Sequence, residues 1–395
     1  MRVLLFTGKG GVGKTTTAAA TAALAAQQGH RVLVLSTDVA HSLADALDLP
    51  LGPQPTQVHD RLYAMQVDGQ GAFERSWRDI QAYLLAVLER AGVDALQAEE
   101  LTVLPGAEEV LALLEVKRQV DSGRWDMVVV DCAPTGETLR LLALPEALQR
   151  YADKIFPAQR RALKALRPLM SRINGPAVPS DALFAAVEQL QGELGQVRAL
   201  LTSPQASVRL VLTPEAVVVA EARRTLTSLA LYGYRVDGLV ANRCFPEGSA
   251  ETFLKGWVAA QQEQLAAISR DAAPLPVLVG PYCDAEPVGL ASLLALGAAL
   301  YGDVDPVAAA PPGPDLLQVE QTQEGFRLSL ALPLAHRKDL ELARSGSDLI
   351  VTVAGHRRVL ALPSALQRCL VAGASLADGR LAIAFTPDPA LWMRT

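Results

Sequence analysis

The chemically most informative stretch of the chain is a glycine-rich segment that also carries two lysines and two threonines. The spacing G-x-x-x-x-G-K-[ST] is complete in residues 8–16, between an apolar run and an alanine-rich run. Glycines allow backbone angles closed to residues with a Cβ, so consecutive N–H groups can point at phosphate oxygens. The pattern predicts a nucleotide-binding loop made of Gly8, Lys9, Gly10, Gly11, Val12, Gly13, Lys14, Thr15 and Thr16.

Two side chains of this loop have distinct expected tasks. Lys14 can reach the β- and γ-phosphates of a bound nucleotide, and we expect it to act in catalysis. The Thr15 hydroxyl can ligate Mg²⁺, while the N-terminus of the helix that begins near Lys14 adds a partial positive charge. The alternative is a glycine turn before an ordinary helix.

Two aspartates stand at the ends of apolar runs. Asp38 follows residues 32–37, where a carboxylate can orient or deprotonate the water that attacks the γ-phosphate, so it is a predicted catalytic residue. A helix N-cap is the other interpretation of Asp38. Asp131 follows Met-Val-Val-Val and is predicted to hold Mg²⁺, either directly or through water.

Positioning these residues requires a parallel sheet. Apolar, β-branched runs alternate with helical patterns, which predicts an α/β fold of the P-loop NTPase type, with a mostly parallel sheet covered on both sides. Ligands of such sheets bind beyond the C-terminal ends of the strands. The runs are residues 3–7, 32–37, 127–131, 208–213, 236–241 and 275–279.

Two stretches exceed what a minimal nucleotide fold needs. Residues of about 72–105 and 148–206 carry apolar positions at helical spacing and are predicted to be α-helical inserts. Their apolar stripes either pack on one another or form an exposed binding surface.

A second domain is expected after a linker. Residues 1–302 form the predicted ATPase domain, and the Pro/Ala-rich residues 303–315 form a linker. Residues 316–388 contain runs of alternating polar and apolar residues, with turns at Ala354-Gly355 and at residues 377–379, which predicts an all-β sandwich.

Composition limits the classes of partner. The chain has 395 residues, is 50% hydrophobic and has a net charge of −6, so we expect no nucleic-acid partner. It contains no apolar run long enough for an integral membrane segment, and its first strand begins at Arg2, so a cytoplasmic protein is expected. Four cysteines without a C-x-x-C pair predict reduced thiols used as small apolar fillers and no structural zinc.

The motifs together resemble one family. G-K-G-G-V-G-K-T-T is similar to the deviant Walker A loop of nucleotide-dependent dimerising ATPases, and S-T-D-V-A-H-S is similar to their switch I, with Val39 replacing a usual proline. D-C-A-P-T-G-E-T-L-R-L-L resembles switch II of the tail-anchored-protein targeting and arsenite-pump ATPases. Residues 358–363 and 374–383 resemble the second half of the α-crystallin domain of small heat-shock proteins.

The resemblance implies roles for particular residues. Lys9 would be catalytic by reaching across a homodimer to the partner's phosphates; the alternative is a solvated lysine on the loop. Asn242 and Pro281 would contact the adenine, because they occupy the strand end and the purine loop of the family. Switch II would comprise Asp131, Pro134, Thr135 and Gly136.

The implied function is a homodimeric, nucleotide-switched ATPase. It would use ATP with Mg²⁺ and bind hydrophobic client segments, tail-anchored membrane proteins among them, for targeting or chaperoning. One alternative is an arsenite-pump subunit that energises metalloid efflux. The other is a holdase chaperone that acts through its β-domain.

Overall fold

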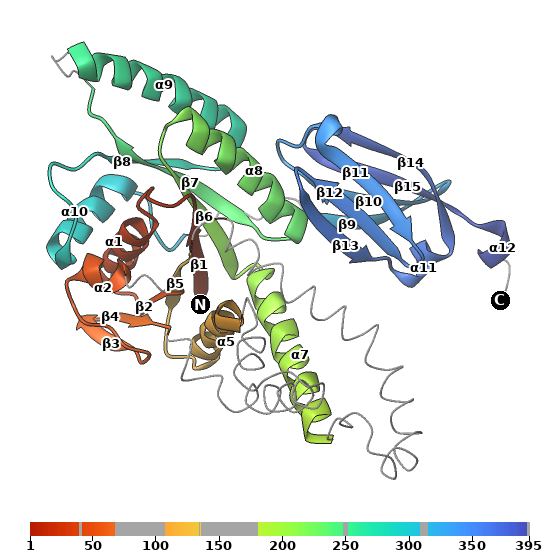
Figure 1. Ribbon diagram of the computed structural model, residues 1–395, viewed down its shortest axis with the longest axis horizontal. Helices are drawn as coiled ribbons and strands as arrows, with labels where there is room; N and C mark the ends of the chain where they lie inside the picture. Colours follow the sequence, from red (N-terminus) through yellow and green to blue (C-terminus); the bar gives the residue numbers. More distant parts are fainter. Residues whose placement is uncertain are drawn as a thin grey trace, which may run out of the picture.

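An eight-stranded sheet organises the N-terminal three quarters of the chain (Figure 1). The computed structural model describes residues 1–38, 42–67, 107–133, 135, 181–247, 252–308 and 315–392. The strand order is β3-β4-β2-β5-β1-β6-β7-β8, and only the β3–β4 edge pair is antiparallel. The strands are β1 (Arg2–Thr7), β2 (Val32–Ser36), β3 (Thr56–His59), β4 (Leu62–Gln66), β5 (Met127–Asp131), β6 (Ala206–Leu212), β7 (Val236–Cys244) and β8 (Val277–Pro281).

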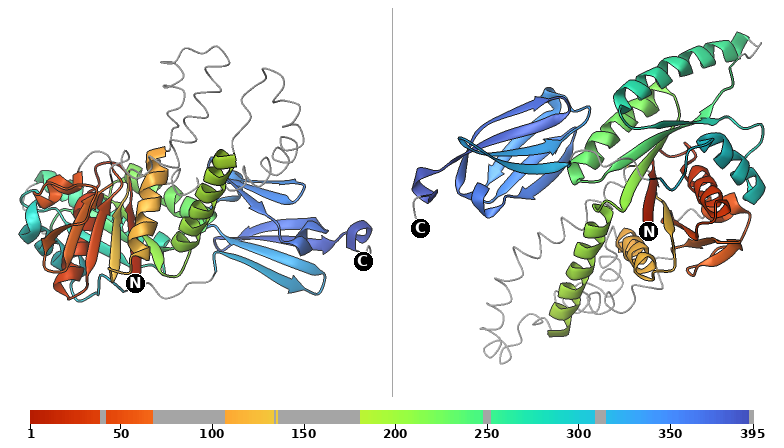
Figure 2. Two further views of the ribbon diagram at one scale, coloured as in Figure 1. Left: turned by 90° about the horizontal axis from the view of Figure 1, so that it is seen from below. Right: turned by 180° about the vertical axis from the view of Figure 1, so that it is seen from behind.

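The central strands are buried on both faces because helices cover both sides of the sheet. Every residue of β1, β2, β5 and β6 is buried, as expected for continuous apolar runs in a parallel sheet. Helices α1 (Lys14–Gln27), α2 (Ser42–Leu47), α9 (Thr252–Ala272) and α10 (Gly289–Tyr301) supply one core. Helices α5 (Ala107–Asp121) and α7 (Asp181–Leu201) supply the other, and α8 (Ala216–Tyr232) contributes to both (Figure 2). The α/β prediction is confirmed.

The C-terminal part is a sandwich of antiparallel sheets, also as predicted. One sheet has the order β14-β15-β10-β9 and the other β11-β12-β13. Left-handed backbone at Ala354, Gly355, Asp378 and Gly379 forms the two expected hairpin turns. The elements are β9 (Leu317–Thr322), β10 (Gly325–Ala331), η1 (Arg337–Asp339), β11 (Leu340–Ser345), β12 (Asp348–Val353), β13 (His356–Ala361), α11 (Ser364–Gln367), β14 (Cys369–Ala377), β15 (Arg380–Pro387) and α12 (Pro389–Trp392).

The C-terminal end of α8 joins the two parts, and Figure 1 shows it beside the sandwich. Leu231 is fully buried and belongs to the same apolar cluster as the interior of the sandwich. The Arg358 guanidinium donates to the Leu231 carbonyl, and the Thr227 hydroxyl donates to the Pro333 carbonyl. The sandwich therefore docks on α8 through both apolar burial and hydrogen bonds.

Most of the predicted helical inserts lie outside the described residues. The first insert, about residues 72–105, is wholly outside, and the second is described only from residue 181 onward, as α7 and the segment that follows it. Leu194, Val197 and Leu201 of α7 are buried, the last two in the core with β5. This end of the second insert thus packs on the sheet.

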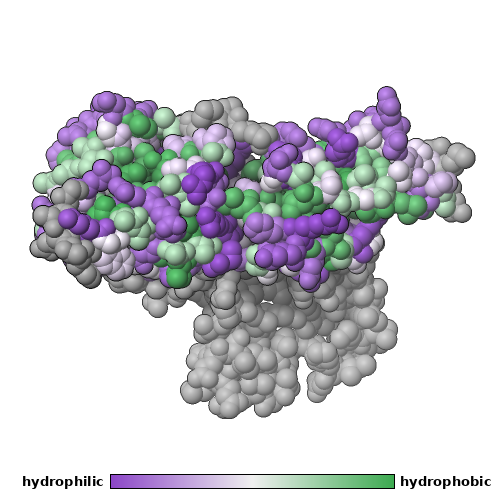
Figure 3. Space-filling model, turned by 90° about the horizontal axis from the view of Figure 1, so that it is seen from above, coloured by the Kyte–Doolittle hydropathy of each residue, from purple (hydrophilic) through white to green (hydrophobic). Residues whose placement is uncertain are grey.

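The surface of the described residues is mixed in character. Figure 3 shows hydrophobic residues in small groups among hydrophilic ones on the face that it presents. Among the helices that the structure describes, none has the length and apolar content needed to cross a membrane.

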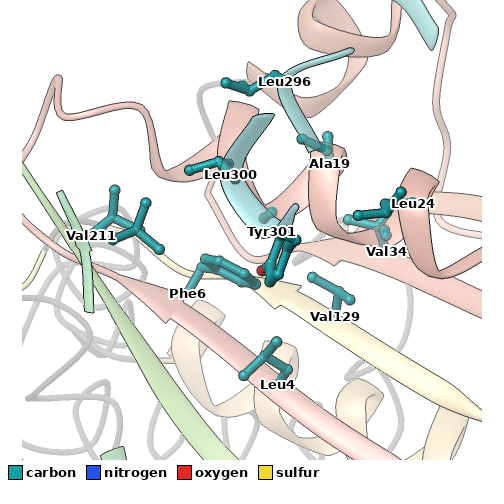
Figure 4. Packing of buried hydrophobic residues seen from close by; sticks show 14 of the residues in the cluster. Leu4, Phe6, Ala19, Leu24, Val34, Val129, Val211, Leu296, Leu300 and Tyr301 are labelled. Carbon is teal, nitrogen blue, oxygen red and sulfur yellow. The ribbon is translucent and has the colours of Figure 1, made fainter. Parts of the chain in front are cut away.

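A polar network is buried beneath the first helix, within the core of Figure 4. The Arg209 guanidinium donates to Asp237 at 2.8 Å and to the Tyr301 hydroxyl at 2.6 Å. That hydroxyl lies 2.8 Å from the Thr21 hydroxyl of α1, and the Tyr301 ring packs beside Phe6 (Figure 4). Burial raises the pKa of Tyr301, so the group stays a neutral donor. The network ties α10, β6 and β7 to the helix that carries the glycine-rich loop.

Candidate nucleotide-binding site

The glycine-rich loop connects β1 to α1 at the C-terminal edge of the sheet. A Cβ at Gly8 would lie 2.0 Å from the Val211 carbonyl oxygen, so only glycine fits there. Gly13 has a φ of +90°, and its Cβ would lie 2.4 Å from Nδ2 of Asn242. Close approach requires glycine at both Gly8 and Gly13, and left-handed backbone requires it at Gly13 as well. Because these positions carry no side chains, the loop's N–H groups remain available for an anion.

The two lysines of the loop face different surroundings. Lys14 is 7% exposed, and its ammonium donates to the Lys9 carbonyl at 3.4 Å, under the loop. The Lys9 side chain is 42% exposed, and its nitrogen lies 4.0 Å from a carboxylate oxygen of Glu221 on α8. Thr15 and Thr16 follow in the first turn of α1, and both are half-buried. Lys14 is placed to act on its own loop, whereas Lys9 points outward.

The Asp131 carboxylate is fully buried at the end of β5. The Ser36 hydroxyl donates to its Oδ2 at 3.3 Å, whereas its Oδ1 has no hydrogen-bond partner among the described residues. The pKa of Asp131 is raised to about 7: burial, the largest cause, and the charge of Asp38 raise it, while a hydrogen bond from Thr15, the Lys14 charge and the Ser36 bond lower it.

This environment fits a hard cation. A buried carboxylate oxygen without a partner, beside a threonine hydroxyl, is an incomplete set of oxygen ligands of the kind that Mg²⁺ prefers. Asp131 and Thr15 are the residues that would hold the ion. When bound, Mg²⁺ would neutralise negative charge on the β- and γ-phosphate oxygens.

Asp38 lies just past the end of β2, next to the same site. Its N–H donates to the Ser36 hydroxyl at 3.2 Å, and its carbonyl accepts a bond from the buried Gln66 amide at 3.2 Å. Residues 39–41 lie outside the described residues. The Ser36 hydroxyl therefore bonds to the Asp131 carboxylate and to the Asp38 backbone, and the structure brings Asp38 and Asp131 together at the ends of the adjacent strands β2 and β5.

Asn242 contacts the glycine-rich loop directly from the end of β7. Its Nδ2 donates to the Val12 carbonyl at 2.9 Å, which leaves Oδ1 as the available acceptor, on the side of Gly280. Pro281 ends β8 opposite Cys244 and is exposed. Beyond it, the Tyr282 and Phe245 rings stack with centroids 5.0 Å apart.

The described part of the predicted switch II segment also contacts the loop. The Thr135 N–H donates to the Gly8 carbonyl at 3.2 Å, and its buried hydroxyl has no partner within the part of the chain that the structure describes. Pro134 and Gly136 lie outside the described residues. The Cys132 thiol is buried, which raises its pKa and suits the expected role of an apolar filler.

Three residues at the site were not singled out from the sequence. They are Gln66, which holds the Asp38 carbonyl, Glu221, which faces Lys9, and Arg243, which donates to the Gly11 carbonyl at 2.8 Å. None belongs to a local motif. A polar residue at a strand end was the only signal available for Gln66 and Arg243.

The site consists of a strand, a glycine-rich loop and a helix, with carboxylates at the ends of the adjacent strands β2 and β5. This arrangement defines a P-loop nucleoside triphosphatase. The chain belongs to the anion-transporting ATPase family, whose model matches residues 1–302, and it is an ATP hydrolase. A second model, described as an HSP20-like domain found in ArsA, matches residues 323–385.

Relatives extend over both parts of the chain. A protein of Chlorobaculum tepidum, provisionally named an arsenical pump-driving ATPase, is 36% identical over 93% of this chain and 91% of its own length. A Streptomyces coelicolor protein named only as uncharacterized is 38% identical over the full length of both chains. An ATPase ASNA1 homolog of Cryptosporidium parvum is 32% identical over 60% of this chain and 63% of its own.

Proposed function

We propose that this ATPase works as a homodimer that closes on ATP and then binds hydrophobic client segments, for membrane-protein targeting or chaperoning. The observation that carries the proposal is the different placement of its two loop lysines. Lys14 is buried under its own loop, so it can serve the nucleotide bound there. Lys9 presents its charge to the outside, where a second subunit could bring phosphates.

The contact that Lys9 makes within its own chain does not oppose this role. The Lys9 and Glu221 side chains are 42% and 30% exposed and their charged atoms are 4.0 Å apart. Ion pairs of this exposure contribute about 0–1 kcal/mol. Lys9 can therefore leave Glu221 for a partner's phosphate at little cost.

The remaining residues have assignable tasks in this cycle. Asp38 orients the attacking water, Lys14 neutralises charge on the phosphates, and Thr15 with Asp131 holds Mg²⁺. Asn242 accepts a hydrogen bond from the exocyclic amino group of adenine through Oδ1, and the bond from its Nδ2 to the Val12 carbonyl holds the amide in that orientation. Pro281 lies against the purine. An acceptor at this point favours ATP over GTP, whose purine carries a carbonyl there.

A Lys9→Ala variant tests the dimer. We expect it to bind ATP with nearly unchanged affinity but to remain monomeric in ATP, with turnover reduced at least about tenfold. Light scattering with and without ATP measures the association. Lys14→Ala is the control and should lose ATP binding itself. An ATP-dependent dimer in Lys9→Ala would contradict the proposal.

An Asp38→Asn variant tests client binding, because it should bind ATP without hydrolysing it. We expect it to capture a peptide with a hydrophobic helix of about 20 residues in ATP but not in ADP. The same peptide with two central leucines replaced by aspartate is the control. Equal capture in both nucleotides would contradict a nucleotide-switched client site.

We also propose where the client binds and where the domains divide. The client surface is assigned to the helical inserts at about 72–105 and 148–206, because apolar residues recur in them at helical spacing. The domains are residues 1–302 and 316–388, joined by residues 303–315.

An arsenite-pump subunit is the second candidate, favoured by the name of the Chlorobaculum tepidum relative. Soft arsenite needs converging thiolates, but Cys132 is buried in the core of the sheet and Cys369 in the sandwich. Stimulation of turnover by arsenite, with no client capture in either nucleotide, would support this candidate instead.

A holdase that acts through the β-domain is the third candidate, because residues 323–385 match an HSP20-like model. Deletion of residues 316–395 separates it from the first. Loss of aggregation suppression with retained ATP turnover would place chaperoning in the β-domain.

A further inference from the structure

The end of β7 places two consecutive side chains on the glycine-rich loop. Successive residues of a regular strand point to opposite faces, so Asn242 and Arg243 should diverge. Instead, Asn242 donates to the Val12 carbonyl at 2.9 Å and Arg243 Nη1 donates to the Gly11 carbonyl at 2.8 Å. Something at this strand end has broken the alternation.

The cause is the backbone of Arg243. Its φ is +58°, in the left-handed region that favours glycine and asparagine, and the β7–β8 register is irregular between Ala241 and Cys244. An arginine in this conformation is held there against its own preference. Backbone strain of this kind persists where surrounding contacts over-determine it.

The two bonds fix two successive peptide planes of the loop. The Gly11 carbonyl shares its peptide with the N–H of Val12, and the Val12 carbonyl shares its peptide with the N–H of Gly13. Because the C=O and N–H of a trans peptide point in opposite directions, drawing both carbonyls toward β7 aims both N–H groups away from it.

Gly11 needs such a restraint. It has a φ of +83°, and a Cβ built on it would meet no heavy atom of the described residues within 4 Å, so the space beside Gly11 is open, in contrast to that of the buried Val12. Arg243 supplies a hydrogen bond at this open point, together with a positive charge near the expected phosphates.

We propose that Arg243 is a positioning residue for nucleotide binding: its guanidinium holds the Gly11 peptide so that the loop's N–H groups face the phosphates. This role rests on the ATP hydrolase activity alone and is independent of the dimer and of any client. The bond is made between groups of the protein alone, so it can hold the loop in the shape that nucleotide binding needs.

Arg243→Asn removes the guanidinium but suits left-handed backbone, so the strand end should keep its shape. We expect Kd for ADP, by calorimetry, and KM for ATP each to rise about tenfold, with kcat changed less than about twofold, because uniform binding is lost. Arg243→Lys keeps the charge but not the planar fork, and should recover only part of the affinity.

Arg61 offers a matched control in the same chain. It also has left-handed backbone, with a φ of +59°, and it also donates to a glycine carbonyl, that of Gly29 at 2.9 Å. Arg61→Asn should leave Kd for ADP and KM for ATP unchanged, while both Asn variants should unfold at nearly the wild-type temperature.

Three results would overturn the proposal. Unchanged nucleotide affinity in Arg243→Asn would show that the bond does not prepare the loop. An equal loss in Arg61→Asn would assign the effect to general stability. Full recovery by Arg243→Lys would assign it to charge rather than to positioning.

Discussion

At the scale of single residues, the Asp131 carboxylate is under opposing demands. Burial raises its pKa to about 7, from an ordinary value of 3.8, because a charge is costly in an apolar interior. A bound cation would need the same group ionised. Protons and Mg²⁺ would therefore compete for Asp131 near neutral pH, and without a bound cation the protein is less stable when this carboxylate is charged.

The sign of this effect gives a prediction for Asp131→Asn. Because the folded-state pKa is raised, the native protein binds more protons than the unfolded chain between pH 3.8 and about 7, so stability falls as pH rises through that window. The cost is complete above pH 7. With no nucleotide or divalent cation present, we expect Asp131→Asn to raise the free energy of unfolding by up to about 4 kcal/mol at about pH 8, since one pKa unit corresponds to about 1.4 kcal/mol, and by much less near pH 4.

Thermal unfolding at the two pH values measures the difference, and ATP turnover should be lost at both. Ser207→Ala is the control, since it alters a buried polar residue distant from the loop. A stabilisation of equal size at both pH values would contradict a titrating Asp131.

Sequence patterns identified those residues of the candidate site that belong to a short motif. They missed the residues that contact a partner far away along the chain. The loop, Asp38 and Asp131 are recognisable because each stands in a short motif next to a strand. Arg243 contacts Gly11 across 232 positions of the chain, and Gln66 contacts Asp38 across 28. Such contacts depend on strand order and backbone conformation, which short motifs do not specify.

At the scale of elements, the same division appears between central and edge strands. The predicted runs match central strands and β8, because burial on both faces or on one leaves a clear apolar pattern. The predicted 275–279 run begins two residues before β8. The strands that were not predicted lie mainly at the edges and are largely exposed, so they lack that pattern: β3, β9, β11 and β14. The mostly buried β4 was also missed, although it is as long as β2 and β5.

The contact between α1 and α10 gives an element-scale prediction. A Cβ at Gly297 would lie 2.8 Å from the Ala20 carbonyl oxygen and 3.2 Å from the Leu24 Cβ. Gly297→Ala must push the two helices apart, and we expect a loss of about 1–3 kcal/mol in the free energy of unfolding.

Gly256 of α9 is the matched control, because a Cβ there meets nothing within 4 Å. Gly256→Ala should be neutral or stabilise by about 0.5–1 kcal/mol through helix propensity. Denaturant unfolding of both variants provides the comparison. Equal effects of the two substitutions would show that α1 and α10 do not pack as closely as described.

At the scale of the whole molecule, α8 links the nucleotide site to the β-domain. In its first half, the Glu221 carboxylate faces the Lys9 ammonium of the glycine-rich loop at 4.0 Å. At its end, Leu231 is buried with the interior of the sandwich, and Arg358 bonds to its carbonyl. A rigid helix with these two contacts can pass a change at Lys9 to the sandwich.

A Leu231→Ala variant tests that link. Removing a fully buried leucine typically costs about 2–5 kcal/mol, and because this leucine belongs to the cluster inside the sandwich, the loss should fall on the docking of the β-domain. We expect faster proteolytic cleavage between residues 302 and 316, and a larger radius in solution scattering, with ATP affinity nearly unchanged. Val217→Ala is the control, because Val217 lies at the start of the same helix and is 69% exposed, and it should alter neither property.

If α8 transmits the nucleotide state, ATP will change the cleavage rate of the wild type but not that of Leu231→Ala. An ATP response that survives the loss of Leu231 would mean that the signal reaches the β-domain by another route.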